Sequence, residues 1–487
     1  MTRRQKLVAL LALTSAALAA VALSAHVSAR PSTTTLWLAA AFLPYAAAVR
    51  LADALDRRTS MRVGLGIALV VGIALVAAPS LLSDDVYRYL WDARVLGAGI
   101  DPYRYAPDHP ALAPLRDALW RRINNPEIPT IYPPVAQLCF FVAEQIAHAP
   151  WSIKACALLA HLAIAPVVAR LAGDDAPRAT LAWTLNPLAL CEAALGGHVD
   201  VLAGLFVALV VLALVRGRPY LAAVACALAS GVKLVGLALA PLVGLRDRRA
   251  AVLAMVLAAL SLAPLVGAGQ GGDAVSGLGQ YARRWRGNEG AFALVQGALR
   301  VGFDVVGPRT GAGPRHIRLA CLAPVLRVVS GTALDPRLAL SAEKKDVPDP
   351  VDFQTEYLAG LAARALVVAG VLVLALVLAR RRTAPLLAAR WVLLVGLLFS
   401  PQVHPWYLLW LLPLEVALAR PTVLVWSALA LVAYAPLDRW LEAREWVDSG
   451  WLRAFEHGTV WVVLAAETGA WTRFFAFWRG KDPRPSP

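Results

Sequence analysis

Carboxylates, cations and aromatic rings gather in a few short polar segments between long apolar runs. The segment 83–92 reads SDDVYRYLWD and carries Asp84, Asp85 and Arg88. One carboxylate of such a pair could take a proton from a hydroxyl group, and two together could hold a divalent cation such as Mg²⁺ or Mn²⁺ against a phosphate. The alternative interpretation is an interfacial helix whose charges face water.

If this segment is a helix, it has two distinct faces. Its apolar stripe has residues at i, i+3 and i+4, namely Tyr87, Leu90 and Trp91. Asp85, Arg88 and Asp92 fall on another face, and Ser83 or Asp84 would cap the N-terminus. We expect such a helix to lie in the membrane interface, with its aromatic rings in lipid.

Two further segments have a composition suited to a loop over a sugar-sized cleft. Residues 99–105 read GIDPYRY, and residues 123–134 read INNPEIPTIYPP. An amide such as that of Asn125 suits sugar hydroxyls, and an aromatic face such as that of Tyr132 suits the C–H groups of a sugar ring. An inert proline-rich loop fits the composition about equally well.

Five isolated polar residues stand at the ends of later apolar runs: His198, Asp200, Lys233, Arg284 and His404. A charge such as Lys233 costs at least ~2.5 kcal/mol at membrane depth, so it either snorkels to the interface or meets an anion. Arg284 lies in a basic stretch that could bind a phosphate or an acidic headgroup. Each residue also has an ordinary structural interpretation, but together they favour one site on one side of a membrane.

The composition requires a membrane to position these segments. Of the 487 residues, 59% are hydrophobic and only 16% are charged, which excludes a soluble enzyme. The net charge of +15 is not concentrated in a basic arm, so no nucleic-acid partner is predicted. The five cysteines stand singly in apolar stretches and are predicted to be packed thiols.

Apolar runs near the ~20 residues of a bilayer span predict an all-α polytopic protein with about twelve transmembrane helices. The expected helices, including one hairpin, are 7–26, 36–53, 63–82, 152–172, 178–196, 198–215, 219–245, 250–267, 357–379, 384–400, 405–419, 421–436 and 457–475. Run 132–149 is expected to be juxtamembrane or re-entrant. With this assignment the strong basic clusters fall on one side, so both termini are predicted to be cytoplasmic.

The same pattern divides the chain into five parts. They are N-terminal transmembrane helices (1–82), an outer loop with juxtamembrane helices (83–151), a central transmembrane bundle (152–290), an outer-face insertion (291–355) and C-terminal transmembrane helices (356–487). Arg3, Arg4 and Lys6 precede the first run, which is long for a signal peptide, so we expect an uncleaved first helix.

In its polar motifs the sequence resembles the GT-C superfamily of integral-membrane glycosyltransferases. Within that superfamily it is similar to bacterial mannosyltransferases that depend on polyprenol-phosphate-mannose. The pieces that carry the resemblance are residues 83–92, 125–134, Asn186-Pro187, 196–200, Lys233 and 404–407.

The resemblance implies a site at the outer face that uses a sugar carried on a polyprenyl phosphate, because nucleotide sugars remain in the cytosol. It implies that an acidic residue of the first outer loop acts as catalytic base or metal ligand, which maps onto Asp84 or Asp85. Contacts to the donor phosphate would map onto Lys233, Arg88 and Arg284. The relatives often have a polar residue where this chain has Val199.

We therefore predict a multi-pass enzyme of the inner (plasma) membrane. It would transfer a hexose, mannose in the first instance, from a polyprenyl-phosphate sugar to a hydroxyl of a glycan or glycolipid acceptor, with inversion. The predicted substrate-binding residues are Tyr132, His198, Asp200, His404 and Asn125. No cofactor is assigned apart from the divalent cation considered at Asp84 and Asp85. The alternatives are a lipid or solute transporter or flippase of the cell envelope, and a non-catalytic scaffold.

Overall fold

The computed structural model of the protein describes residues 1–28, 30–244, 246–267, 277, 286–306, 316–319, 332–333 and 350–469. This part of the chain is almost entirely helical. In a bilayer a backbone N–H or C=O finds no water, so a spanning segment must pair these groups within its own helix.

Seven helices among the described residues are long and apolar enough to cross a membrane. They begin at Arg3, Pro31, Arg57, Pro150, Arg248, Glu356 and Thr422. Seven shorter apolar helices of 10–17 residues accompany them. The predicted all-α polytopic architecture is confirmed, and the count of about twelve spans stays a prediction.

The N-terminal half begins with three long helices and continues through a series of shorter ones. Its α-helices are α1 (Arg3–Val27), α2 (Pro31–Arg50), α3 (Arg57–Ala77), α4 (Asp85–Gly97), α5 (Pro134–Ile146), α6 (Pro150–Leu171), α7 (Ala176–Thr184), α8 (Pro187–Cys191), α9 (Asp200–Val215), α10 (Pro219–Val232), α11 (Val235–Gly244) and α12 (Arg248–Gly267). A π-helical turn, η5 (Glu192–Gly196), follows α8.

The C-terminal half contains longer helices interrupted by 3₁₀ turns. Its helices are α14 (Ala291–Val301), α17 (Pro350–Arg380), α18 (Pro385–Leu398), η7 (Pro405–Trp410), α19 (Leu412–Ala417), α20 (Thr422–Leu429), η8 (Ala430–Tyr434), α21 (Leu437–Ala443) and α22 (Gly450–Glu467).

Contacts divide the chain into two compact units. The first comprises Met1–Leu278, Leu374–Leu394 and His404–Pro487, and the second comprises Gly279–Val373 and Val395–Val403. In the second unit three short antiparallel strands form a sheet in the order β1 (Phe303–Val306), β2 (His316–Leu319), β3 (Thr332–Ala333), with Phe303 opposite Leu319. The sequence analysis did not predict this sheet, and its five-part division stays a prediction.

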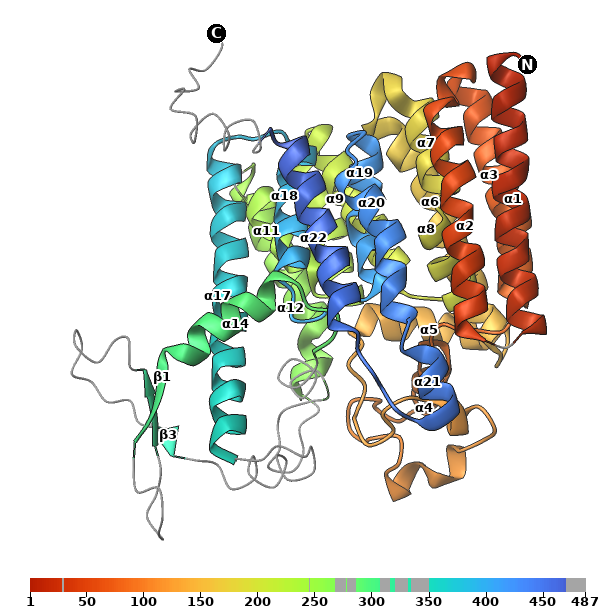
Figure 1. Cartoon of the computed structure of the whole chain (residues 1–487). Coiled ribbons are helices and arrows are strands. Elements are labelled where there is room, and N and C mark those ends of the chain that lie inside the picture. Colours follow the sequence, from red (N-terminus) through yellow and green to blue (C-terminus); the bar gives the residue numbers. More distant parts are fainter. Residues whose placement is uncertain are drawn as a thin grey trace. The chain divides into compact units, whose positions relative to one another are not determined.

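Helix α4 corrects one expectation about the outer segment. Tyr87, Leu90 and Trp91 are at most 3% exposed and pack inside the protein, not in lipid. The reason is that α5 packs across α4: the rings of Tyr89 and Phe140 stack with centroids 4.3 Å apart. Both helices lie at the end of the first unit opposite the N-terminus of the chain (Figure 1).

A second correction concerns the run 178–196, which is not one continuous helix. It is broken at Asn186, where α7 ends and α8 begins. Pro187 lacks a backbone N–H and disfavours helical backbone at the residue before it. The Asn186 side chain caps the new helix by accepting a hydrogen bond from the N–H of Ala189 at 3.0 Å.

Three charged residues that look scattered in the sequence form a buried network in the C-terminal helices. The Arg390 guanidinium on α18 lies 2.6 Å from Glu415 on α19 and 2.8 Å from Glu467 on α22. All three are nearly inaccessible to solvent. Removing one partner of such a buried group would leave an uncompensated charge, so the network fixes how these helices pack.

Helix α9 carries a close approach that only glycine allows. A Cβ at Gly204 would collide with the backbone carbonyl of Leu409 in η7. We expect Gly204→Ala to push the two elements apart and to lower the free energy of unfolding by about 1–3 kcal/mol. The measurement is the melting temperature of the detergent-solubilised protein. Gly66→Ala on α3 is the matched control, because nothing lies within 4 Å of a Cβ there. Equal melting temperatures for both variants would contradict the prediction.

Candidate active site

The two carboxylates of the first outer segment share one amide. Asp84 is the N-cap of α4 and Asp85 is its first residue. Asn124 donates from Nδ2 to Asp84 Oδ1 at 2.9 Å and to Asp85 Oδ1 at 2.7 Å. Asp84 is exposed to solvent, whereas Asp85 is only partly exposed. The more buried carboxylate, Asp85, is therefore the better candidate base, because the surrounding side chains can hold it in place.

Two tyrosines and a histidine surround the second oxygen of Asp85. The hydroxyl of Tyr132 donates to Asp85 Oδ2 at 3.3 Å, and that of Tyr89 donates at 3.5 Å. The Nε2 atom of His198 lies 4.0 Å from the same oxygen. The Asp85 side chain remains 17% exposed, so a substrate hydroxyl could reach it.

Lys233 lies at the break between α10 and α11, as the predicted hairpin requires. Its backbone is extended, with φ −146° and ψ 140°. Its Nζ lies 3.4 Å from Asp200 Oδ2 and within 5.1 and 5.6 Å of the ring centroids of Tyr132 and Tyr407. The ammonium group is thus held by one carboxylate and two aromatic faces, and its side chain is 17% exposed.

The segment 404–410 completes the cluster with stacked rings. The imidazoles of His198 and His404 both stack on Trp406, with centroids 3.9 and 4.2 Å from it. Tyr407 stacks on Trp410 at 4.5 Å, and the indole N–H of Trp410 donates to Asp200 Oδ1 at 2.9 Å. Burial lowers the pKa of His404 to about 3, so its imidazole is neutral at physiological pH.

Most of the residues singled out in the sequence therefore meet. Tyr132 contacts both Asp85 and Lys233, and Tyr407 contacts both Lys233 and His404. The residues that the structure brings together are Asp84, Asp85, Tyr132, His198, Asp200, Lys233 and His404. The first and the last of them are more than 300 residues apart in the sequence. Together the seven residues form one cluster, which we call the acid–lysine centre.

Arg88 and Asn125 do not contact the residues of this centre through the hydrogen bonds that hold them, and their roles toward substrate stay predictions. The Arg88 guanidinium pairs with Asp92 at 2.9 Å and donates to the carbonyls of Ile128 at 2.8 Å and Asn125 at 3.2 Å. Its side chain is only 6% exposed. It fixes the loop that carries Asn124. Arg284 lies outside the described residues.

Several residues that contact the acid–lysine centre were not among the predicted site residues. The amide of Asn124 donates to Asp84 and Asp85, while the backbone of its neighbour Asn125 adopts a φ of 42° and contributes its carbonyl. The spacing of Trp406, Tyr407 and Trp410 could have indicated the aromatic contacts, because it places three large rings within two helical turns. Nothing in the sequence distinguished the two adjacent asparagines.

A divalent cation does not fit between the two carboxylates as they are arranged. An N–H donor of Asn124 occupies the bridging position between them. The described residues also contain no group of three or more His, Cys, Asp or Glu side chains able to hold a metal ion. A cation would have to displace the amide, so we derive no step through one.

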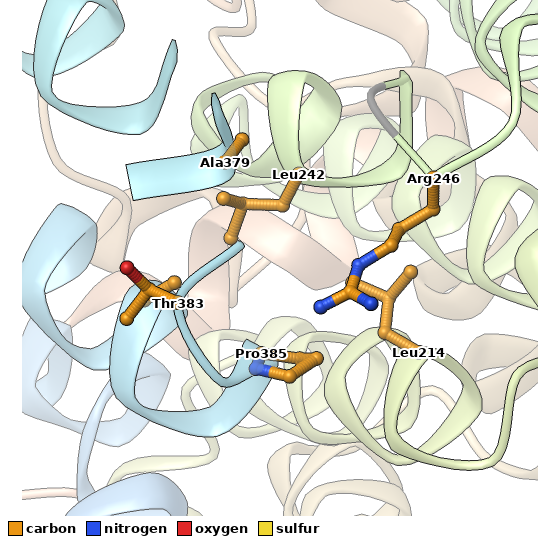
Figure 2. Close-up of a pocket in the computed structure, with 7 residues that line it drawn as sticks. Leu214, Leu242, Arg246, Ala379, Thr383 and Pro385 are labelled. Carbon is orange, nitrogen blue, oxygen red and sulfur yellow. The ribbon is translucent and has the colours of Figure 1, made fainter. Parts of the chain in front are cut away.

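A hollow elsewhere in the first unit is not this site. It is lined by Leu214, Leu242, Arg246, Ala379, Thr383, Pro385 and Ala388, with the Arg246 side chain beside Leu214 and Pro385 (Figure 2). Leu214 is near the end of α9, whereas Asp200 begins it. Fourteen residues of helix separate them by about 21 Å.

The fold and the centre define a class of protein. Polytopic helices that carry a carboxylate, a lysine and aromatic rings at one end fit a membrane glycosyltransferase. Comparison with known families is more specific: residues 9–249, about half of the chain, match the family model of the N-terminal domain of alpha-(1->6)-mannopyranosyltransferases, MptA_B family. Neither a search of curated proteins nor a search of solved structures found a match. The family match confirms the resemblance to membrane mannosyltransferases and supports a mannosyltransferase role.

The matched part contains most of the acid–lysine centre. It includes the residues from Asp84 to Lys233, whereas the aromatic segment 404–410 lies outside it. The C-terminal half therefore supplies the stacked rings to a centre whose charged groups come from the part of the chain that matches the family model.

Proposed function

We propose that the protein transfers mannose from a polyprenyl-phosphate donor to an acceptor hydroxyl at the outer face of the membrane, with inversion at the anomeric carbon. The observation that carries this proposal is the pairing of a partly exposed carboxylate, Asp85, with a partly exposed ammonium, Lys233, across the shared ring of Tyr132. A base and an anion-binding group side by side suit a displacement on a sugar phosphate.

In the proposed reaction, Asp85 takes the proton of the acceptor hydroxyl as its oxygen attacks the anomeric carbon. The bond from that carbon to the donor phosphate oxygen breaks, and the polyprenyl phosphate leaves with the bonding electrons. Lys233 stabilises the negative charge on the departing phosphate. A single displacement of this kind inverts the configuration.

The surrounding groups hold the two reacting side chains in place. Asn124, Tyr89 and Tyr132 all donate to Asp85, so its carboxylate is oriented before substrate binds. Asp200, itself held by Trp410, fixes the ammonium of Lys233. Because the charges are already positioned, little reorganisation is needed in the transition state.

Charge placement supports the outer side for this centre. Helix α9 begins at Asp200 in the centre and ends at Val215, directly before Arg216 and Arg218. Helix α11 likewise runs from Lys233 toward Arg246, Arg248 and Arg249. Since such basic clusters favour the cytoplasmic side, the centre at the opposite helix ends faces outward.

The test is transfer by the purified protein in proteoliposomes. Polyprenyl-phosphate mannose labelled in the sugar would be supplied with a panel of mannoside acceptors, and nucleotide-activated mannose and polyprenyl-phosphate glucose would be the donor controls. We expect labelled product only with the polyprenyl-phosphate mannose, and an α-linkage in the product if the donor is β-linked.

Two results would overturn the proposal. Transfer from the nucleotide sugar would place the donor site on the cytoplasmic side. Movement of the labelled lipid across the bilayer without incorporation into any acceptor would favour a transporter or flippase instead.

A further inference from the structure

A buried carboxylate lies behind the acid–lysine centre and has no role in the reaction described so far. Glu192 is the first residue of the π-helical turn η5 and is 2% exposed. One of its oxygens lies 2.9 Å from His198 Nδ1, and the other accepts a hydrogen bond from the hydroxyl of Tyr434. π-Helical turns are rare and often occur at functional sites.

The backbone reinforces this contact. The N–H of His198 donates to the carbonyl of Glu192 at 3.0 Å, so the turn folds the histidine back over the glutamate. A Cβ at Gly196 would collide with the imidazole, which shows how closely the turn surrounds it. The imidazole is fully buried and stacks on Trp406. Its other nitrogen, Nε2, lies 4.0 Å from Asp85 Oδ2.

We infer that Glu192 is a positioning residue, which orients His198 so that Nε2 can take the acceptor's proton from Asp85. This inference rests on the proposed function. The carboxylate of Glu192, 2.9 Å from Nδ1, favours a proton on Nδ1 by its charge, and the neutral ring then carries its lone pair on Nε2. After the acceptor O–H bond breaks, its proton passes to Asp85 and then to Nε2. Asp85 returns to its ionised form, and the imidazolium releases the proton to water when the product leaves.

The geometry suits a transfer that completes only with substrate bound. A separation of 4.0 Å between Nε2 and Asp85 Oδ2 is longer than a hydrogen bond. Catalytic hydrogen bonds are often long without substrate and shorten in the reacting complex. The pairing of an acid with one ring nitrogen of a histidine base is the arrangement that fixes the tautomer in serine hydrolases.

The carboxylates around His198 favour the protonated form of its imidazole. The titratable groups that face it are Glu192, Asp84, Asp85, Asp200 and His404. Burial lowers the pKa of His198, but the contact with Glu192 and its charge, together with Asp85 and Asp200, raise the pKa above its ordinary value. An imidazolium formed during turnover is therefore stabilised.

Glu192→Gln is the decisive variant. The amide keeps the size of the side chain and can still accept from Tyr434, but it presents an N–H group to Nδ1 and so favours the opposite tautomer. We expect kcat to fall about 10- to 100-fold, near the lower end of the ~10²–10⁴ typical of acid–base groups, with little change in the KM of either substrate. Because the negative charge is lost, the pKa of His198 falls and the acid limb of the kcat profile moves to lower pH.

Three companion variants separate positioning from folding. Glu192→Asp restores the charge and should recover part of the lost kcat. Tyr434→Phe leaves the carboxylate in place and should have a smaller effect than Glu192→Gln. Glu456→Gln is the matched control: this buried glutamate accepts from Trp426 in the C-terminal helices, outside the centre, and its amide can still accept. We expect it to retain wild-type kcat.

A second measurement does not depend on activity. In protein labelled with ¹⁵N-histidine, at a pH above the pKa of His198 and with His198→Gln used to assign the signal, we expect the Nδ1–H tautomer in the wild type and the Nε2–H tautomer in Glu192→Gln. Equal tautomers, or a wild-type kcat in Glu192→Gln, would overturn the inference. Failure of the wild type to transfer mannose would overturn the proposed function instead, and the tautomer measurement would still decide the inference.

Discussion

Asp85→Asn should reduce mannose transfer about 10²- to 10⁴-fold, the range expected when a general base is removed. The substituted amide has nearly the shape of the carboxylate and can still accept from Tyr132, so the fold should be retained. It cannot accept the proton of the acceptor hydroxyl. The measurement is kcat in proteoliposomes containing equal amounts of folded protein, with both substrates at saturation.

Asp84→Asn is the matched control, since the two carboxylates are adjacent and share the amide of Asn124. Asp84 is exposed to solvent, whereas Asp85 is partly buried, also accepts from Tyr132 and lies 4.0 Å from His198. A neutral amide should therefore replace Asp84 with a much smaller loss of kcat than at Asp85. Equal losses in the two variants, or a larger loss in Asp84→Asn, would contradict the assignment of Asp85 as the base.

Removal of the Lys233 ammonium should weaken use of the donor. A charge-assisted contact to the phosphate is worth about 1.5–3 kcal/mol, which corresponds to a roughly 10- to 100-fold fall in kcat/KM for the polyprenyl-phosphate sugar. Lys233→Met alone would also leave the buried carboxylate of Asp200 without its cation, which can destabilise a protein by about 3–5 kcal/mol.

The double variant Lys233→Met/Asp200→Asn separates these two effects. It removes both charges of the pair, and the new amide can still accept from the indole of Trp410. We expect it to fold with near wild-type stability and to keep the loss of kcat/KM for the donor. Lys233→Arg, which retains the cation, should retain more activity. A double variant that used the donor as well as the wild type does would show that the lysine is only a structural partner of Asp200.

Local sequence features determined the elements of this protein. The lengths of the apolar runs predicted spanning helices, seven of which are long and apolar enough among the described residues, and the break at Lys233 and the polar start at Asp84 were visible as interruptions of those runs. The distribution of arginines predicted that the polar interruptions share one side of the membrane. These signals are readable because burial in a bilayer depends on the composition of each segment by itself.

Only the tertiary structure decided which side chains face one another. Of two adjacent asparagines, Asn124 meets the carboxylates with its amide, whereas Asn125, with a φ of 42°, meets Arg88 with its carbonyl. Arg88 turned from the centre toward Asp92 and the loop carbonyls, since burial requires each of its donors to find an acceptor.

The same limit applies to the partners of the centre. Tyr434 reaches Glu192 across 242 residues, and Trp410 reaches Asp200 across 210. Periodicity along a helix says which residues share a face, but the rotation of that helix against a distant one depends on the packing of all the side chains between them. The sequence by itself therefore determined the helices and the polar ends where a site could form, and the packing decided which groups form it.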